Sequence, residues 1–170
     1  MVSQSAYANS AREARFRIDA SNSQPRAVSV IALDGASEAL VRELARTHWM
    51  GARFLLAKPF AVAPTSVVQF PAVGLVSDLT GQDRQLIDEI DTADLVVLIV
   101  TAGADAESAS IIGEACFLKR VMMTAFVLAG TSMPDEVLST TLAQLRPWTQ
   151  MLVVTSAAEH VADVLKSLRA

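Results

Sequence analysis

The amino-acid sequence predicts an α/β domain in which a mostly parallel sheet of about five or six strands lies between two layers of helices. Two observations carry this prediction. Short apolar runs rich in β-branched residues alternate along the chain with segments whose apolar residues recur at helical spacing. The runs are apolar throughout, which is typical of strands that helices cover on both faces. Such alternation requires right-handed crossovers and a three-layer sandwich.

The chain opens its regular structure with a strand, a helix and a second strand. Residues 27–33 form an apolar run that ends at Asp34, so we expect a buried strand there. Asp34 or Ser37 caps the following helix, and Gly51 marks its end. Residues 53–57 form the second strand. The apolar face of the helix comprises Leu40, Val41, Leu44, Ala45 and Trp49.

The next stretch carries weaker signals. Residues 58–80 contain several prolines among many apolar residues, and we expect a short edge strand at 66–70 inside a long connection. Thr80 and Asp83 resemble a capping box, which predicts a short helix with Leu86, Ile87 and Ile90 on its apolar face. Residues 94–100 then form the clearest buried strand.

The C-terminal third continues the same alternation of helices and strands. One helix is predicted from a cap at Asp105 to Lys119 and Arg120. A second starts at Ser132 and Asp135 and stops at Pro147, and a third starts with a capping-box pattern at Ser156 and Glu159. Strands are predicted at 121–128 and 150–154. Residues 1–26 have few bulky apolar side chains, so we expect a flexible arm followed by a single Rossmann-like domain at 27–170.

Composition narrows the classes of partner. The net charge is −4 with scattered basic residues, which disfavours nucleic acid. No apolar run approaches the roughly 18 residues that cross a bilayer, which disfavours a membrane. A single cysteine and the absence of a signal-peptide pattern favour the cytoplasm. Apolar residues make up 52% of the chain, so we expect a homo-oligomer that covers part of this surface.

A ligand of an open α/β sheet binds beyond the carboxyl ends of its strands, where the winding direction reverses. Two loops meet this condition. The candidate ligand-binding residues are Asp34, Gly35 and Ser37 in the first loop and Thr101, Gly103 and Asp105 in the second. Each loop has one glycine and one carboxylate, a poor match to a phosphate cradle. The two aspartates either cap helices only or accept hydroxyl groups of a ribose or sugar.

Residues 87–103 read Ile-Asp-Glu-Ile-Asp-Thr-Ala-Asp-Leu-Val-Val-Leu-Ile-Val-Thr-Ala-Gly. This segment, with residues 27–57, resembles the nucleotide-binding half of the FtsZ/tubulin family, in which an acidic helix precedes a strand ending in Thr-Ala-Gly. Where that family has its GGGTGTG triphosphate loop, residues 104–110 bring two carboxylates that would repel phosphate. The opening glycine cluster is reduced to Gly35, and the catalytic loop and activation domain have no counterpart. The resemblance, over about 27–155, therefore implies a diverged domain without GTPase activity.

No other residues form a convincing chemical site. His48 and His160 lack partners at metal-ligand spacing, so no metal site is predicted. Cys116 falls on an apolar helix face and is interpreted as core, which leaves no predicted catalytic residue. The acidic residues Asp88, Glu89, Asp91 and Asp94 are interpreted as a solvated surface. The pair Met122 and Met123 is interpreted as core.

Two functions remain open at this point. The first is a noncatalytic binding or assembly domain that oligomerises through residues 61–76, with Val67, Val68 and Phe70 at the interface. The second is a small enzyme or sensor that binds a nucleotide, flavin or sugar phosphate at the carboxyl edge of the sheet. The sequence does not identify a cofactor.

Overall fold

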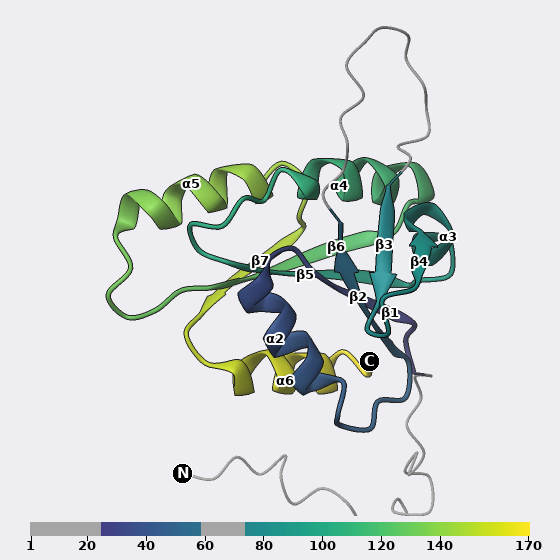
Figure 1. Ribbon diagram of the computed structural model, residues 1–170. Helices are drawn as coiled ribbons and strands as arrows, with labels where there is room; N and C mark the ends of the chain where they lie inside the picture. The colour runs from purple at the N-terminus through teal and green to yellow at the C-terminus, as the bar shows by residue number, and fades with distance from the viewer. Residues whose placement is uncertain (1–24, 59–73) are drawn as a thin grey trace, which may run out of the picture.

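The computed structural model describes residues 25–58 and 74–170, and it has the predicted three-layer α/β architecture (Figure 1). A seven-stranded sheet has the order β4-β3-β2-β1-β5-β6-β7. The strands are β1 (Val28–Ala32), β2 (Ala52–Ala57), β3 (Leu75–Asp78), β4 (Asp83–Gln85), β5 (Leu95–Thr101), β6 (Met122–Leu128) and β7 (Met151–Thr155). The helices are α2 (Gly35–Leu44), α3 (Leu86–Asp91), α4 (Ser108–Lys119), α5 (Asp135–Leu145) and α6 (Ala158–Ser167).

Five strands of this sheet are parallel, and their order places a switch point between β1 and β5. The sheet runs β2-β1-β5-β6-β7 through its parallel part. Numbered among themselves, these strands have the doubly wound order 2-1-3-4-5. After β1 the chain passes to α2 on one face, and after β5 it passes to α4 on the other (Figure 1). The two connections therefore diverge, and a crevice opens between them.

The core consists of two apolar layers, one on each face of the sheet. On one face the sheet packs against α3, α4 and α5, and on the other against α2 and α6. β5 contributes to both layers, because its residues from Leu95 to Val100 are all buried. Full burial of consecutive side chains explains why this strand is apolar without alternation.

Two strands that the sequence did not predict form a hairpin at one edge. β3 and β4 are antiparallel to each other, and β3 is antiparallel to β2. In their turn the Asp78 carboxylate accepts hydrogen bonds from the Thr80 amide at 2.9 Å and the Gln82 amide at 3.0 Å, and Gly81 has a φ of +86°. The predicted capping box of Thr80 and Asp83 is therefore wrong, because both belong to the hairpin. The helix itself starts later, at Leu86, with the predicted Leu86 and Ile90 buried.

Four helix ends differ from the sequence prediction, and one of them is the start of α5, where Pro134 rather than Ser132 is the N-cap. α2 ends at Leu44 rather than near Gly51, and the Trp49 indole donates back to the Leu44 carbonyl at 2.7 Å. α4 has Glu107 at its N-cap, and α6 has Ala157 rather than Ser156. Neither of these N-cap residues makes a side-chain hydrogen bond of its own, but each donates its amide to a preceding side chain, Glu107 to Asp105 and Ala157 to Thr155.

Some sequence predictions fall on residues that the structure does not describe. These are the arm apart from its last two residues, the edge strand at 66–70, and the interface residues Val67, Val68 and Phe70. Within the two described ranges, no helix combines the length and the apolar character that a bilayer crossing requires.

Candidate functional site

The two loops selected from the sequence meet at the switch point. The Asp34 carboxylate, at the end of β1, accepts a hydrogen bond from the Thr101 amide at 2.8 Å and from the Thr101 hydroxyl at 3.0 Å. The Leu33 amide donates to the Ile99 carbonyl at 3.0 Å beside this contact. The ends of β1 and β5 therefore lie side by side at this edge of the sheet, joined through Asp34 and Thr101.

Asp34 also caps α2. Its Oδ1 atom accepts hydrogen bonds from the Ala36 amide at 2.9 Å and the Ser37 amide at 3.0 Å. The Ser37 hydroxyl in return accepts from the Asp34 amide at 3.1 Å, which completes a capping box. One carboxylate therefore satisfies amides at the start of α2 and at the end of β5 at the same time.

These contacts favour the ionised form of Asp34. Burial alone would raise the pKa of this carboxyl group, because a charge is less stable away from water. Hydrogen bonds from Thr101 and Ser37 to the charged form outweigh that effect and hold the pKa of Asp34 below its ordinary value of 3.8. The group is an anion at neutral pH, and it lies where a phosphate-binding protein would bind its ligand.

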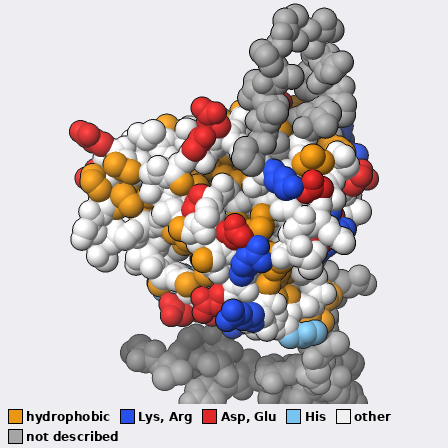
Figure 2. All heavy atoms as spheres, viewed as in Figure 1, with side chains coloured by type: hydrophobic (Ala, Val, Ile, Leu, Met, Phe, Trp, Pro, Cys, Tyr) orange, Lys and Arg blue, Asp and Glu red, His pale blue; other side chains and the backbone are white. Residues whose placement is uncertain are grey.

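A cleft of about 260 Å³ opens beside this carboxylate, and we call it the switch-point cleft. Acidic side chains gather on this face over the beginning of α2 (Figure 2). The Glu38 carboxylate at the cleft is paired with Arg42 at 2.7 Å, while Asp105 contributes a further carboxylate. No lysine or arginine is among the described lining residues, which are Ala32, Leu33, Asp34, Gly35, Glu38, Leu56, Ala57, Asp105 and Ser108.

A second, more open cleft of about 360 Å³ lies between the β5 loop and α5. The Thr141 hydroxyl accepts from the Gly103 amide at 2.9 Å, and the Gln144 side-chain oxygen accepts from the Ala106 amide at 3.3 Å. Asp105 lines this cleft as well as the switch-point cleft, so one carboxylate can serve a ligand in either.

Gly103 is fixed by geometry rather than by ligand chemistry. Its φ of +87° is a conformation that favours glycine. A Cβ atom there would lie 2.8 Å from Cγ1 of Val137. Any larger residue at this position strains the loop, so substitutions of Gly103 are poor probes of binding.

Asp105 does not cap α4 as predicted. Its Oδ1 atom accepts from the amide of Glu107 at 2.9 Å, the residue just before the helix begins at Ser108. The physical reason is the length of the loop: two residues separate Asp105 from the first helical residue, which is too many for an N-cap. The exposed position of Asp105 leaves it accessible in both clefts.

The structure distributes the predicted residues over different roles. Asp34, Gly35 and Asp105 line the switch-point cleft, while Gly103 lines the second cleft. Ser37 is fully buried and serves the cap, and Thr101 is half-buried and binds Asp34. Sequence reasoning missed Glu38, Leu56, Ala57, Ser108, Thr140, Thr141 and Gln144. Glu38 directly follows the capping box in the sequence. This nearness to the predicted site residues was the signal that could have identified it.

Cys116 is buried, as predicted, and burial raises the pKa of its thiol to about 12. A thiol in this state is neither a nucleophile nor easily alkylated. We expect iodoacetamide at about pH 8 to leave Cys116 unmodified in the folded protein and to modify it fully in guanidinium, as measured by intact-mass spectrometry. Rapid labelling of the folded protein would show that this helix opens far more readily than its packing indicates.

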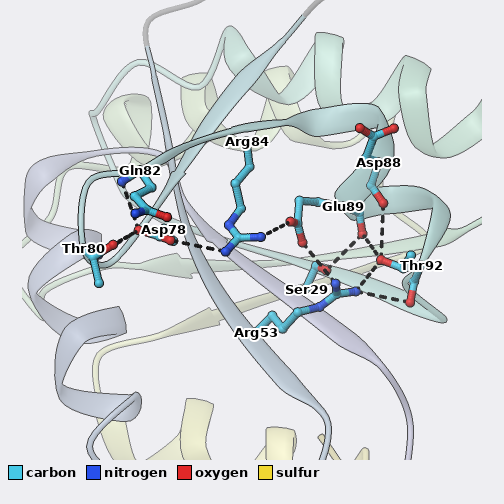
Figure 3. Close-up of polar contacts among 9 residues, drawn as sticks. All are labelled: Ser29, Arg53, Asp78, Thr80, Gln82, Arg84, Asp88, Glu89 and Thr92. Atoms are coloured by element: carbon cyan, nitrogen blue, oxygen red, sulfur yellow. Dashed lines mark hydrogen bonds and ion pairs between the residues drawn. The ribbon is translucent and has the colours of Figure 1, made fainter.

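A separate polar cluster lies near the amino ends of β1 and β2, away from the clefts. Arg53 and Arg84 reach the Glu89 carboxylate from two sides, at 3.2 and 3.4 Å (Figure 3). Glu89 is only 7% exposed, so its interpretation as part of a solvated surface is wrong. Its Oε2 atom lies within ion-pair distance of Arg53 but makes no directed hydrogen bond.

This cluster joins elements that are distant in the sequence. Arg84 also contacts Asp78 at 3.4 Å, and Arg53 donates to the Thr92 hydroxyl at 2.6 Å. The contacts tie the edge hairpin and β2 to α3, and a structural role accounts for all of them. In residues 25–58 and 74–170 no three carboxylate, histidine or cysteine side chains come together in a way that could hold a metal ion.

The remaining predictions for single residues have mixed outcomes. Met123 is buried as predicted, but Met122 is 53% exposed. His160 contacts the Thr155 hydroxyl at 3.0 Å through its Nδ1 atom, beside the start of α6. Neither His48 nor His160 lines the switch-point cleft or the second cleft.

Comparison with known proteins identifies no family. No family model matches the chain, and no curated protein matches it. Among solved structures, the model is similar to the NMR structure of the apo-form of the flavoprotein from Lactobacillus acidophilus NCFM, with a TM-score of 0.46 and 7% sequence identity. The match covers 82% of this chain and 99% of that chain. A likeness at this level assigns neither a ligand nor a function to the chain.

Proposed function

We propose that this chain is a noncatalytic binding domain whose switch-point cleft holds a small molecule rich in hydroxyl or amine donors, such as a nucleoside or sugar without a phosphate group. The observation that carries the proposal is the position of Asp34. Its carboxylate takes up the amides of Ala36, Ser37 and Thr101, which a phosphate group at this edge would otherwise use.

The charge of the cleft supports the same class of ligand. Arg42 pairs with Glu38 at the cleft, but Asp34 and Asp105 have no such ion pair with a described residue, and no lysine or arginine is among the described lining residues. A phosphate would meet like charges, whereas hydroxyl and amine groups donate hydrogen bonds to carboxylates. Leu33, Leu56 and Ala57 add an apolar wall for the ring of a nucleobase or sugar.

The lining also supports binding without catalysis. The described residues at the two clefts include no histidine, cysteine or lysine, so neither cleft offers the usual pair of a nucleophile and a base. The kinship with the FtsZ/tubulin family stays a prediction in this proposal, together with its implied lack of GTP hydrolysis. Homo-oligomerisation through residues 61–76 likewise stays a prediction.

Matched pairs of compounds that differ only by a phosphate group test this proposal. Thermal unfolding is recorded with adenosine and AMP, riboflavin and FMN, and ribose and ribose 5-phosphate, because a bound ligand raises the midpoint by mass action. We expect at least one unphosphorylated compound to raise the midpoint more than its phosphorylated partner. Stabilisation by the phosphorylated members instead would favour the nucleotide, flavin or sugar-phosphate site, and no stabilisation by any compound would refute the proposal.

Asp105→Asn locates the binding within the clefts. Loss of one charge-assisted hydrogen bond costs about 1.5 to 3 kcal/mol, so the Kd for the stabilising compound should rise about tenfold to a hundredfold. Asp163→Asn is the matched control, because Asp163 is exposed on α6 and lines neither cleft. Equal affinities for these two variants, measured by calorimetry, would place the ligand elsewhere.

A further inference from the structure

The two edges of the sheet differ in how they are protected. At one edge, β4 is three residues long and carries Asp83 and Arg84, and short charged strands discourage pairing with another chain. At the other edge, β7 has the sequence Met-Leu-Val-Val-Thr and no charge. Met151 is 40% exposed and Val154 is 44% exposed. An uncharged apolar edge of this kind is a template for another strand.

The outward backbone groups of β7 follow from its pairing with β6. The Ala129 amide donates to the Thr155 carbonyl at 3.0 Å, so Thr155 directs its backbone groups toward β6. Backbone groups alternate in direction along a parallel strand, so Leu152 and Val154 direct their amides and carbonyls away from the sheet. β7 is the last strand in the described sheet, and no described strand lies beyond these groups.

We propose that a second copy of this chain pairs with β7 in an antiparallel arrangement, across a two-fold axis at Val153. In this register Leu152 lies opposite the partner's Val154, and both residues direct their backbone groups across the interface. Val153 lies opposite the partner's Val153 as a pair without hydrogen bonds, with Cα atoms about 4.5 Å apart. The two sheets become one continuous sheet.

The sequence of the strand fits a second copy in particular. A two-fold interface requires a surface that complements itself. In the register centred on Val153, Met151 lies opposite the partner's Thr155, and no charged side chains of the two strands meet. A strand pair of five residues is a small interface, so we expect a dimer with a Kd on the order of micromolar rather than an obligate one.

Single cysteines on the edge test the register. In Val153→Cys the two Cα atoms would lie about 4.5 Å apart, within the range that a disulfide spans, so mild oxidation should give a covalent dimer. Ser156→Cys is the control, because it is exposed and lies three residues from the axis, so its two copies would be about 20 Å apart. The native Cys116 is buried and adds no background. Equal cross-linking of both variants would overturn the register.

A proline tests the edge itself. Val154→Pro removes an outward amide without removing a hydrogen bond to β6, so we expect it to abolish dimerisation while circular dichroism stays unchanged. Sedimentation over concentrations from about 1 to 500 µM measures the change, and the wild type should pass from monomer to dimer in this range. A wild type that stays monomeric throughout would overturn the proposal. Should Val154→Pro fail to fold, the cysteine variants decide alone.

Discussion

Replacing Asp34 with alanine should lower the free energy of unfolding by about 2 to 4 kcal/mol at neutral pH. Loss of an N-cap costs about 1 kcal/mol, and loss of a charged acceptor for a partly buried amide and hydroxyl costs about 1 to 3 kcal/mol more. The substitution would remove the acceptor of the Thr101 amide and hydroxyl, and also the acceptor of the Ser37 amide at the start of α2. Urea unfolding followed by circular dichroism measures the difference.

Asp34→Asn separates the cap from the bridge to β5. Asparagine is as good an N-cap as aspartate, but its amide nitrogen would face the Thr101 amide, donor against donor. We therefore expect a loss of about 1 to 2 kcal/mol, smaller than for alanine and clearly above zero. An asparagine variant as stable as the wild type would mean that the contact with Thr101 contributes nothing.

The stabilisation by Asp34 should depend on pH in one direction. The folded-state pKa lies below the ordinary value of 3.8, so the folded protein binds fewer protons than the unfolded chain near this value. The contribution is fully present above pH 3.8 and is lost as the pH falls through the lower, folded-state pKa. The stability difference between wild type and Asp34→Asn should accordingly narrow only below about pH 4.

Glu89→Ala should lower the free energy of unfolding by about 1 to 3 kcal/mol. The buried carboxylate neutralises Arg53 and Arg84, whose side chains are 41% and 49% exposed. Because both arginines can recover water, the cost is smaller than the 3 to 5 kcal/mol typical of a broken, fully buried pair. The loss should appear first in the edge hairpin, as faster amide exchange in β3 and β4.

Asp88→Ala is the matched control for this prediction. Asp88 is the exposed neighbour of Glu89 on α3, and an exposed substitution there should change the stability by no more than about 0.5 kcal/mol. Equal effects of the two substitutions would show that the loss arises from general charge on α3 rather than from the contacts of Glu89.

The sequence predicts the convergence at the switch point because the signals there are local. Apolar runs without alternation identify β1 and β5, and the cap at Asp34 follows from residue type and spacing. The rule for parallel sheets then brings the ends of these strands to one edge. The contact between Asp34 and Thr101 needs only these two steps.

Other features depend on tertiary contacts that no local pattern records. Asp83, Arg84 and Gln85 include none of the residue types enriched in strands, and pairing with β3 forms the strand nevertheless. Glu89 lies in an acidic run that is typical of a solvated helix, and only the fold brings Arg53 of β2 to it. Residues from α5 line the second cleft, and their position depends on how that helix packs rather than on its sequence.

The central claim is that the Asp34 carboxylate occupies the amides at the switch point, and NMR tests it most directly. Amide protons bound to a carboxylate change their chemical shift when that group is protonated. As the pH is lowered from 7, the amides of Ala36, Ser37 and Thr101 should move together with a common midpoint below pH 3.8, and they should not move in this way in Asp34→Asn. A Thr101 amide that does not follow the other two, or a common midpoint above 3.8, would contradict the account.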